Sequence, residues 1–136
     1  VYTTIGKDPR FTQKIVEILI GFLDYKRKET RLNAVKSLGE IGSEIAIGKL
    51  VEIINSGSEK REKQRESPEV RRLAVEALGE IGGRAVGELV SIIQNKGSSM
   101  RVDAIQALEK LGDERAVTPL LNVLNEQGGR DVIVSY

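Results

Sequence analysis

The sequence lacks cysteine and histidine, and it has no tryptophan and only two phenylalanines. Without cysteine there are no disulfide bonds, thiolate metal sites or cysteine nucleophiles, and without histidine the usual zinc, haem and catalytic-triad arrangements cannot form. A hydrolase would have to use carboxylates, lysine, tyrosine or serine alone. We therefore expect no catalytic residues, no metal site and no cofactor, and we expect that the protein is not an enzyme. The absence of cysteine also favours a reducing, cytoplasmic location.

Long apolar runs are missing as well. A membrane-spanning helix needs about 20 apolar residues, whereas the longest candidate, residues 15–23, is interrupted by Glu17. We therefore expect no membrane association. Hydrophobic residues make up 40% of the chain but aromatic residues only 4%, so the core has to be built from isoleucine, leucine, valine and alanine. That supply favours packing of helix on helix, and the length suits one domain.

One segment of the chain recurs. Residues 30–42 are repeated closely at 70–82 and more loosely at 100–112. Each copy has an arginine near its start, then an alanine and a β-branched residue, then large aliphatic residues three and six positions later. This spacing places the apolar residues on one stripe of a helix. The three stripes are Ala34, Val35, Leu38 and Ile41, then Ala74, Val75, Leu78 and Ile81, then Ala104, Ile105, Leu108 and Leu111.

Each copy carries signals for where its helix begins and ends. Gly42, Gly82 and Gly112 follow the three stripes, where a left-handed glycine would end the helix. Ser67 precedes Pro68 and predicts a capped helix start, and Ser98 or Ser99 is expected to cap the third copy. A second apolar segment follows each glycine, at 46–54, 85–93 and 116–124. The pattern predicts antiparallel helical hairpins.

The run from Val70 to Gly82 closely resembles the short HEAT-like repeat first associated with phycobilisome lyases. The resemblance covers residues 30–125 and departs at Glu109, where the other copies have Gly39 and Gly79. It implies an all-α, right-handed α-solenoid of antiparallel helical hairpins. Such repeats occur in scaffolds, adaptors and a few enzymes, and they carry no local catalytic motif that could be transferred to this chain.

The repeats organise the chain as a single HEAT-like domain, residues 1–136. We expect a partial repeat at 1–28, because 14–19 matches 49–54, and full repeats at 29–55, 68–95 and 99–125. A charged insertion at 56–67 reads as a solvated loop or a frayed helix extension rather than a binding arm, although long connections are often functional. A further repeat could start at 130–136. Neither terminus resembles a polar cap, so we expect a piece of a longer solenoid, or end-to-end association of copies.

The resemblance also indicates where a partner would bind. In HEAT arrays the second helices line the concave surface, and their polar positions form columns along it. Gly48 and Gly87 share one position in these helices, where glycine costs about 1 kcal/mol relative to alanine, so we expect close approach of a neighbour or a partner. An ordinary solvated face is the alternative. The candidate protein-binding residues are Glu17, Glu52, Asn55, Ser91, Gln94, Asn122 and Asn125.

The connections between hairpins suggest a second kind of surface. They are rich in basic residues although the whole chain has a net charge of only +1, so one edge of the solenoid is expected to be basic and could follow nucleic-acid phosphates or an acidic protein. The scarcity of aromatic residues for stacking on bases weakens the nucleic-acid reading, and the arginines at one repeated position are expected to pair with acids of adjacent repeats. The edge comprises Lys26, Arg27, Lys28, Arg31, Arg71, Arg72 and Arg101.

Together these patterns favour a non-enzymatic scaffold or adaptor that binds another protein through the surface of its second helices. A nucleic-acid-associated HEAT-like protein that uses the basic edge is the main alternative. An accessory subunit of an enzyme is a third. The sequence does not identify the partner.

Overall fold

The computed structural model of the chain describes residues 8–56 and 66–126. The core of the predicted insertion, 57–65, the predicted start of a further repeat, 130–136, and the first residues of the partial repeat lie outside the described residues. Seven α-helices and no β-strand are present in the two described ranges. The predicted all-α solenoid is confirmed.

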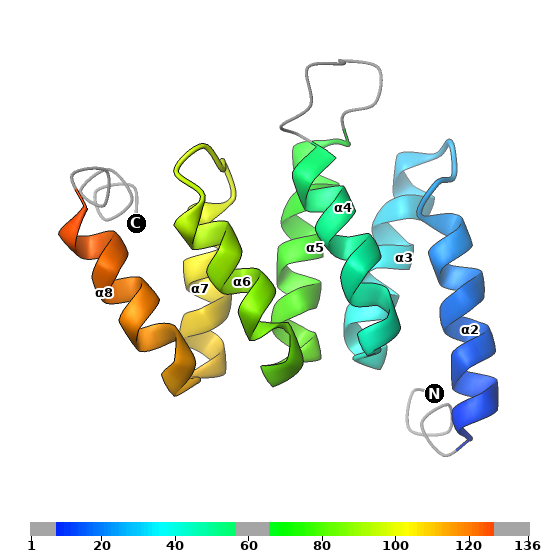
Figure 1. The fold of residues 1–136 in the computed structure, drawn as a ribbon. Coiled ribbons are helices and arrows are strands. Elements are labelled where there is room, and N and C mark those ends of the chain that lie inside the picture. The colour runs from blue at the N-terminus through cyan, green and yellow to red at the C-terminus, as the bar shows by residue number, and fades with distance from the viewer. Residues whose placement is uncertain (1–7, 57–65, 127–136) are drawn as a thin grey trace.

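The helices form two rows (Figure 1). We call α3, α5 and α7 the first helices and α2, α4, α6 and α8 the second helices. Each second helix packs against the first helix of the following hairpin: α2 on α3, α4 on α5 and α6 on α7. Short 3₁₀ turns, η1, η4 and η5, join the two helices of each hairpin. The bounds are α2 Pro9–Phe22, α3 Lys28–Ile41, η1 Glu44–Ala46, α4 Ile47–Asn55, α5 Pro68–Ile81, η4 Gly83–Ala85, α6 Val86–Gln94, α7 Arg101–Leu111, η5 Glu114–Ala116 and α8 Val117–Asn125.

Glycine ends each first helix, as the sequence predicts. Gly42 and Gly112 adopt the left-handed conformation, with φ of 74° and 61°. Gly82 has φ 91° but ψ −142°, so it lies outside the left-handed region that we expected. Its conformation is still one that only glycine adopts readily. The three stops therefore share a positive φ but not one geometry.

Of the two helix starts for which the sequence predicts a serine cap, one is confirmed, and α2 has a further cap that was not predicted. Asp8 caps α2 by accepting hydrogen bonds from the backbone of Arg10 and Phe11, and Ser67 caps α5 by accepting from the backbone of Val70. The expected serine cap of the third hairpin is wrong, because α7 begins at Arg101 with Met100 in the N-cap position and no side-chain cap. Ser98 lies before the helix, where its hydroxyl accepts a hydrogen bond from the backbone N–H of Met100 at 3.2 Å, and Met100 itself is only 3% exposed.

The two ends of the insertion are close together. Ser56 Oγ donates to the carbonyl oxygen of Ile53 at 2.6 Å and accepts from the backbone N–H of Glu66 at 3.3 Å. The chain therefore leaves α4 and returns to α5 at nearly the same point. The hairpin stack continues across the insertion without an offset.

The predicted stripes form the core between the two rows. In each stripe the alanine is buried, and so is the residue directly after it, except for Ile105, which is half-buried. The last residue of each stripe is half-buried. The second helices contribute Leu50, Leu89 and Ile93, which have no exposed surface. Burying an aliphatic side chain of this size stabilises the fold by about 1.5–3 kcal/mol.

Successive first helices approach closely at small residues. A Cβ built on Gly39 would lie 2.8 Å from Cα of Ala77 in α5, and one built on Gly79 would lie 3.2 Å from Cβ of Ala107 in α7. A side chain at Gly39 would displace the next layer, whereas one at Gly79 would require only a small adjustment of Ala107. The same position in α7 holds Glu109.

A second row of contacts joins the layers at the 3₁₀ turns. Glu44 in η1 forms an ion pair with Arg84 in η4. One layer further on, Arg115 in η5 donates from Nη2 to the carbonyl oxygen of Gly83 in η4 at 2.8 Å. Gly83 occupies the position of Glu44, and Arg115 occupies that of Arg84. Residues at the same two positions of the 3₁₀ turns thus join consecutive layers at both steps of the stack.

The glycine contact predicts opposite effects for two glycine-to-alanine changes. Gly39→Ala should lower the free energy of unfolding by about 1–3 kcal/mol, because the added methyl group meets the backbone of α5. The matched control, Gly48→Ala in α4, should raise it by about 0.5–1 kcal/mol, because nothing lies within 4 Å of its Cβ and alanine restricts the unfolded chain. Urea denaturation followed by circular dichroism measures both. Equal effects in the two variants would contradict the close contact.

Candidate functional site

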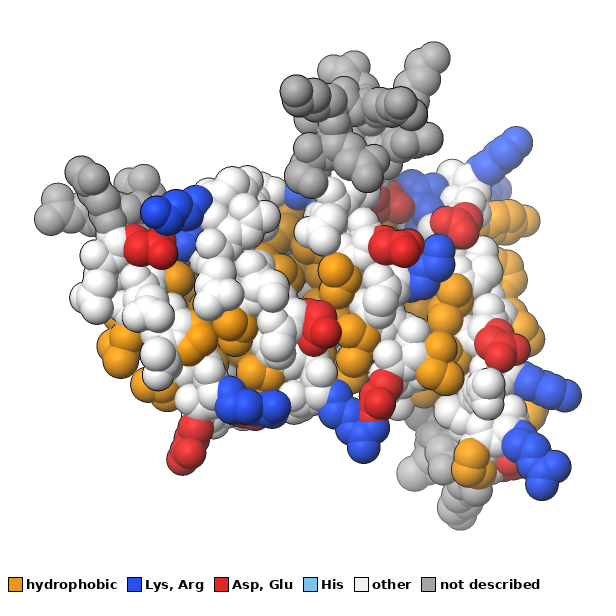
Figure 2. Space-filling view, viewed as in Figure 1, with side chains coloured by type: hydrophobic (Ala, Val, Ile, Leu, Met, Phe, Trp, Pro, Cys, Tyr) orange, Lys and Arg blue, Asp and Glu red, His pale blue; other side chains and the backbone are white. Residues whose placement is uncertain are grey.

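The row of second helices presents one continuous surface to the viewer in Figures 1 and 2. Figure 2 shows that most of its lysine and arginine side chains lie along the upper and lower margins, with apolar patches between the helices. All seven candidate residues of this surface are exposed. They are Glu17 on α2, Glu52 and Asn55 on α4, Ser91 and Gln94 on α6, and Asn122 and Asn125 on α8.

Helical periodicity brings these residues into columns. Positions three or four apart share one face of a helix, so Glu52 and Asn55 lie together on α4, and Ser91 and Gln94 lie together on α6. Local contacts hold part of the columns in place. Glu52 pairs with Lys49 at 3.3 Å, and the Ser91 hydroxyl donates to the Gly87 carbonyl oxygen at 3.1 Å.

A shallow hollow of about 250 Å³ lies between α4 and α6. Asn55 and Ser91, both predicted from the sequence, stand at its wall. The sequence did not indicate the hollow itself, because it depends on the gap between two helices that lie in different repeats. Its other lining residues are Val51, Ile54, Glu88, Ile92, Asn95 and Ser98. The mixture provides apolar contact area together with amide, hydroxyl and carboxylate groups.

A second hollow, of about 200 Å³, lies between α2 and α4 and is lined in part by Glu52. Acidic and basic side chains contribute more here: Asp24, Lys49 and Glu66 stand at its wall. The other four candidate residues, Glu17, Gln94, Asn122 and Asn125, are exposed outside the two hollows.

Two glycines add a third column to the same face. Gly48 and Gly87 lie one turn before Glu52 and Ser91, and the equivalent residue of α8 is Thr118. The sequence led us to expect a neighbour or a partner close to these glycines. Within the described part of the chain no neighbour is present, since nothing lies within 4 Å of a Cβ built on either residue. The bare backbone of α4 and α6 is therefore open to solvent at these points.

Family comparisons match this arrangement of stacked hairpins. Residues 60–133 match the model of HEAT repeats, and residues 30–56 match that of the PBS lyase HEAT-like repeat. The chain belongs to the HEAT repeat family. No curated protein matches the chain.

HEAT repeats generally mediate protein–protein interactions as scaffolds. None of the described helices of this HEAT array is long and apolar enough to cross a membrane. Within residues 8–56 and 66–126 no group of three or more acidic side chains is arranged to hold a metal ion.

The basic edge of the HEAT array is partly occupied by contacts within the chain. Arg31 donates from Nε and Nη2 to the two carboxylate oxygens of Glu66, at 2.7 and 3.0 Å, and from Nη1 to the carbonyl oxygens of Tyr25 and Lys26. Arg31 thus pairs with an acid, but this acid, Glu66, belongs to the insertion and not to the adjacent repeat, where the sequence led us to expect it. Lys28 pairs with Glu69 at 3.0 Å across the same two layers.

The other repeated arginines also hold layers together. Arg101 is buried and donates from Nε to the carbonyl oxygen of Ile93 at 2.8 Å. Arg71 donates to the Ser99 hydroxyl at 2.7 Å rather than to an acid. The remaining edge residues are more exposed: Lys26 and Arg27 lie at the surface, and Arg72 lies 3.7 Å from Asp103.

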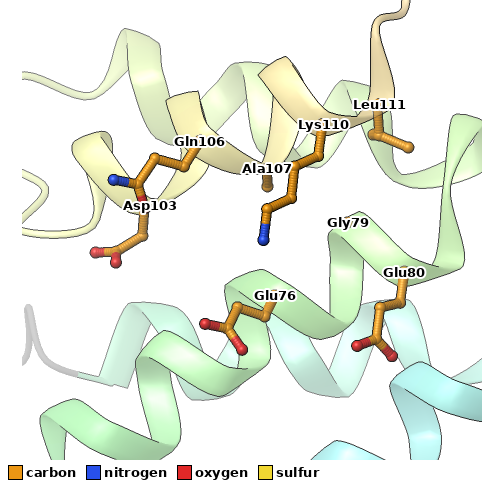
Figure 3. A pocket seen from close by; sticks show the side chains of 8 residues that line it. All are labelled: Glu76, Gly79, Glu80, Asp103, Gln106, Ala107, Lys110 and Leu111. Atoms are coloured by element: carbon orange, nitrogen blue, oxygen red, sulfur yellow. The ribbon is translucent and has the colours of Figure 1, made fainter.

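A further hollow, of about 310 Å³, lies between the first helices α5 and α7 (Figure 3). The sequence did not point to it. It lies beside the close contact of Gly79 with Ala107, and the Lys110 side chain extends from α7 toward α5, which carries Glu76 and Glu80. Asp103, Gln106 and Leu111 complete its lining.

The charges around this hollow shift one titration. Partial burial raises the pKa of Glu80, and the nearby carboxylates of Glu40 and Glu76 raise it further, while Lys36 and Lys110 act in the opposite direction. The raised pKa means that the ionised carboxylate is less favourable in the folded chain than in water. Glu80 therefore lies in a cluster of carboxylates at the surface, and nearby lysines offset part of their repulsion.

Removal of Arg31 should be far more disruptive than removal of Lys28. Arg31→Met leaves the Glu66 carboxylate, which is only 12% exposed, without its partner and should lower the free energy of unfolding by about 2–3 kcal/mol. Lys28→Met is the matched control, because its pair with Glu69 is exposed and should change stability by less than about 1 kcal/mol. Thermal and urea denaturation measure the difference. Similar losses would show that Arg31 has no special role between the layers.

The turn before α8 gives a prediction about pH. The guanidinium and backbone N–H of Arg115 donate to the Asp113 carboxylate at 2.7–3.0 Å and lower the pKa of Asp113 from 3.8 to about 2. Because the folded-state pKa is depressed, the contribution to stability is present above pH 4 and is lost as the pH falls from about 4 to 2. In Arg115→Gln the pKa of Asp113 should return toward 3.8, and carbon-detected NMR titration measures this change. An unchanged pKa would contradict the pairing.

Proposed function

We propose that the protein is a scaffold or adaptor that binds another protein through the surface of its second helices. The observation that carries the proposal is the recurrence of exposed polar side chains at equivalent positions on successive second helices, beside the hollow between α4 and α6. Side-chain amides such as Asn55 and Gln94 can both donate and accept hydrogen bonds. A partner can therefore be held by polar contacts at regular intervals.

Preformed structure supports the same proposal. The second helices are fixed by their packing on the first helices, so a partner would not have to order them, and little conformational entropy would be lost from this side of the interface. The open backbone at Gly48 and Gly87 adds support, because a partner can approach α4 and α6 there without meeting side chains. Glycine inside a helix costs about 1 kcal/mol relative to alanine.

The basic edge supports nucleic-acid binding less well. Arg31, Arg71 and Arg101 are held by contacts between layers, so their guanidinium groups are less available to phosphates. Lys26 and Arg27 remain exposed. These two cations can attract either a nucleic acid or an acidic protein. The basic edge therefore remains the second candidate surface.

Site-specific cross-linking tests the proposed surface. Because the chain has no cysteine, Ser91→Cys gives one attachment point for a photoactivatable cross-linker at the hollow between α4 and α6. Asn33→Cys on the exposed face of α3 is the matched control. After irradiation in native cell extract, Ser91→Cys should give a discrete covalent protein adduct and Asn33→Cys should not. The adduct yield should fall at least about tenfold when Gln94→Arg is added, since a new buried charge at an interface is costly.

Two results would reject the proposal. Equal labelling from the two cysteine positions would show that the second-helix surface is not selective. Retardation of labelled duplex or single-stranded DNA by the wild-type chain, lost on addition of salt and in the double variant Lys26→Glu and Arg27→Glu, would favour the nucleic-acid function instead.

A further inference from the structure

One arginine recurs at the same place in each hairpin, and its three copies differ in what they bind. Arg31, Arg71 and Arg101 lie at equivalent positions of α3, α5 and α7. Arg31 donates from Nε and Nη2 to the two carboxylate oxygens of Glu66. A carboxylate fits this edge of a guanidinium group because its two oxygens match the two parallel N–H groups. The first copy therefore shows which ligand this edge of the arginine takes, an oxyanion with two oxygens.

Arg71 presents the same edge but pairs with no acid in the described part of the chain. Its Nη2 donates to the Ser99 hydroxyl at 2.7 Å, while its Nε is buried and has no hydrogen-bond partner. A buried N–H group without an acceptor is unfavourable, because it has lost its hydrogen bond to water. The edge that binds Glu66 at Arg31 is thus only half used at Arg71.

Ser99 occupies the place in the stack that Glu66 has one layer earlier. Glu66 directly precedes Ser67, the N-cap residue of α5, and Ser99 directly precedes Met100, the N-cap residue of α7. Each arginine thus reaches the residue before the N-cap of the next first helix. The difference between the two layers is the chemistry of that residue, a carboxylate in one and a neutral hydroxyl in the other.

The surroundings of Ser99 favour a negative charge. Ser99 lies at the N-terminus of α7, an 11-residue helix, and the dipole of a helix stabilises anions at this end. Arg101 in the first turn of α7 is buried, and its Nη2 lies 3.6 Å from Glu126 without a hydrogen bond. The acidic residues nearest along the chain, Glu69 and Asp103, are each already beside a basic residue. An additional negative charge at Ser99 is therefore favoured.

A phosphoryl group on Ser99 meets these requirements better than an anion from outside. Ser99 is exposed, so an enzyme can reach its hydroxyl, whereas the Nε of Arg71 is buried. An external carboxylate or phosphate would have to displace the Ser99 hydroxyl from Nη2 before it contacted Nε. A phosphate bonded to Ser99 Oγ is already at the guanidinium edge, and its oxygens are strong hydrogen-bond acceptors.

We propose that Ser99 is a phosphorylation site and that Arg71 binds the resulting phosphate through Nε and Nη2. A protein kinase transfers the γ-phosphoryl group of a nucleoside triphosphate to Ser99. The bond from phosphorus to Ser99 Oγ forms, the bond to the β-phosphate oxygen breaks, and the hydroxyl proton passes to a base of the kinase. The phosphate then links α5 to the start of α7, as Glu66 links α3 to the start of α5.

The modification acts beside the candidate docking surface. Asn95 and Ser98, in the same connection as Ser99, line the hollow between α4 and α6. A phosphate that ties this connection to Arg71 fixes one wall of the hollow. This consequence rests on the proposed function, whereas the phosphate site can be measured in the chain alone and can fail while the docking surface stands.

A double-mutant cycle measures the coupling between the phosphate and Arg71. The chain is produced with and without phosphoserine at position 99, in the wild-type and the Arg71→Gln backgrounds. In the wild-type background phosphoserine should lower the equilibrium constant for unfolding on the order of tenfold, because a charged acceptor fills a buried donor. In Arg71→Gln it should not stabilise the fold. Urea denaturation followed by circular dichroism measures all four proteins.

Two further variants separate recognition by the guanidinium edge from attraction between charges. Arg71→Lys keeps the charge but lacks the two parallel N–H groups, so it should recover only part of the coupling. Ser99→Glu places a carboxylate where α5 has Glu66 before its N-cap, and it should stabilise the wild-type background but not Arg71→Gln. The second pKa of phosphoserine is about 6 when it is free. Phosphorus NMR should show a lower value in the wild-type background than in Arg71→Gln.

Mass spectrometry tests whether the modification occurs. The unmodified chain is incubated with native cell extract and ATP and is then digested with trypsin. Cleavage after Lys96 and Arg101 releases one short peptide that contains both Ser98 and Ser99. Fragmentation of this peptide should place the phosphate on Ser99, and the peptide from Ser99→Ala should carry none.

Three results would overturn the proposal. The first is an equal effect of phosphoserine on stability in the wild-type and Arg71→Gln backgrounds. The second is a phosphate that titrates at the same pH in both. The third is a peptide in which Ser99 stays unmodified, whether or not the extract phosphorylates Ser98.

Discussion

The distance between successive layers is set by contacts between very small residues. Gly39 meets Ala77, and Gly79 meets Ala107, with too little room for one additional methyl group at the first contact. This close approach of the first helices brings each aliphatic stripe against the next hairpin. It also places Arg31 within reach of Glu66 and Glu44 within reach of Arg84, since these pairs span adjacent layers. The polar pairs follow from the spacing and do not create it.

The fold could be predicted in most of its parts because its determinants are local and repeated. Aliphatic residues at helical spacing predicted the core stripes, and the glycines predicted the helix ends. Two local details differed. Helix α7 begins beyond Ser98 and Ser99, with the buried Met100 in the N-cap position, and Gly82 has a positive φ outside the left-handed region. Both depend on how a neighbouring hairpin packs, and that information is not contained in a short window of sequence.

The candidate surface was predictable only as far as helical periodicity reaches. Periodicity placed Glu52, Asn55 and Ser91 on the outward face of their helices, and they are exposed. The hollows beside them depend on the gap between helices of different repeats. The partner of Arg31 was likewise beyond reach, because Glu66 is 35 residues away, at the end of an insertion that has no counterpart in the other repeats. The binding role of the surface stays a prediction.

The hydrogen bonds of Ser56 have a consequence for how the array can vary. Since the backbone of Glu66 lies at the Ser56 hydroxyl, the excursion between them begins and ends at one place on the framework. Its length is then decoupled from the stacking of hairpins, and doubling such a loop costs only about 0.6 kcal/mol in closure entropy. This junction is a natural graft point, where natural variation or an engineer can exchange one peptide for another while the helical framework keeps its shape.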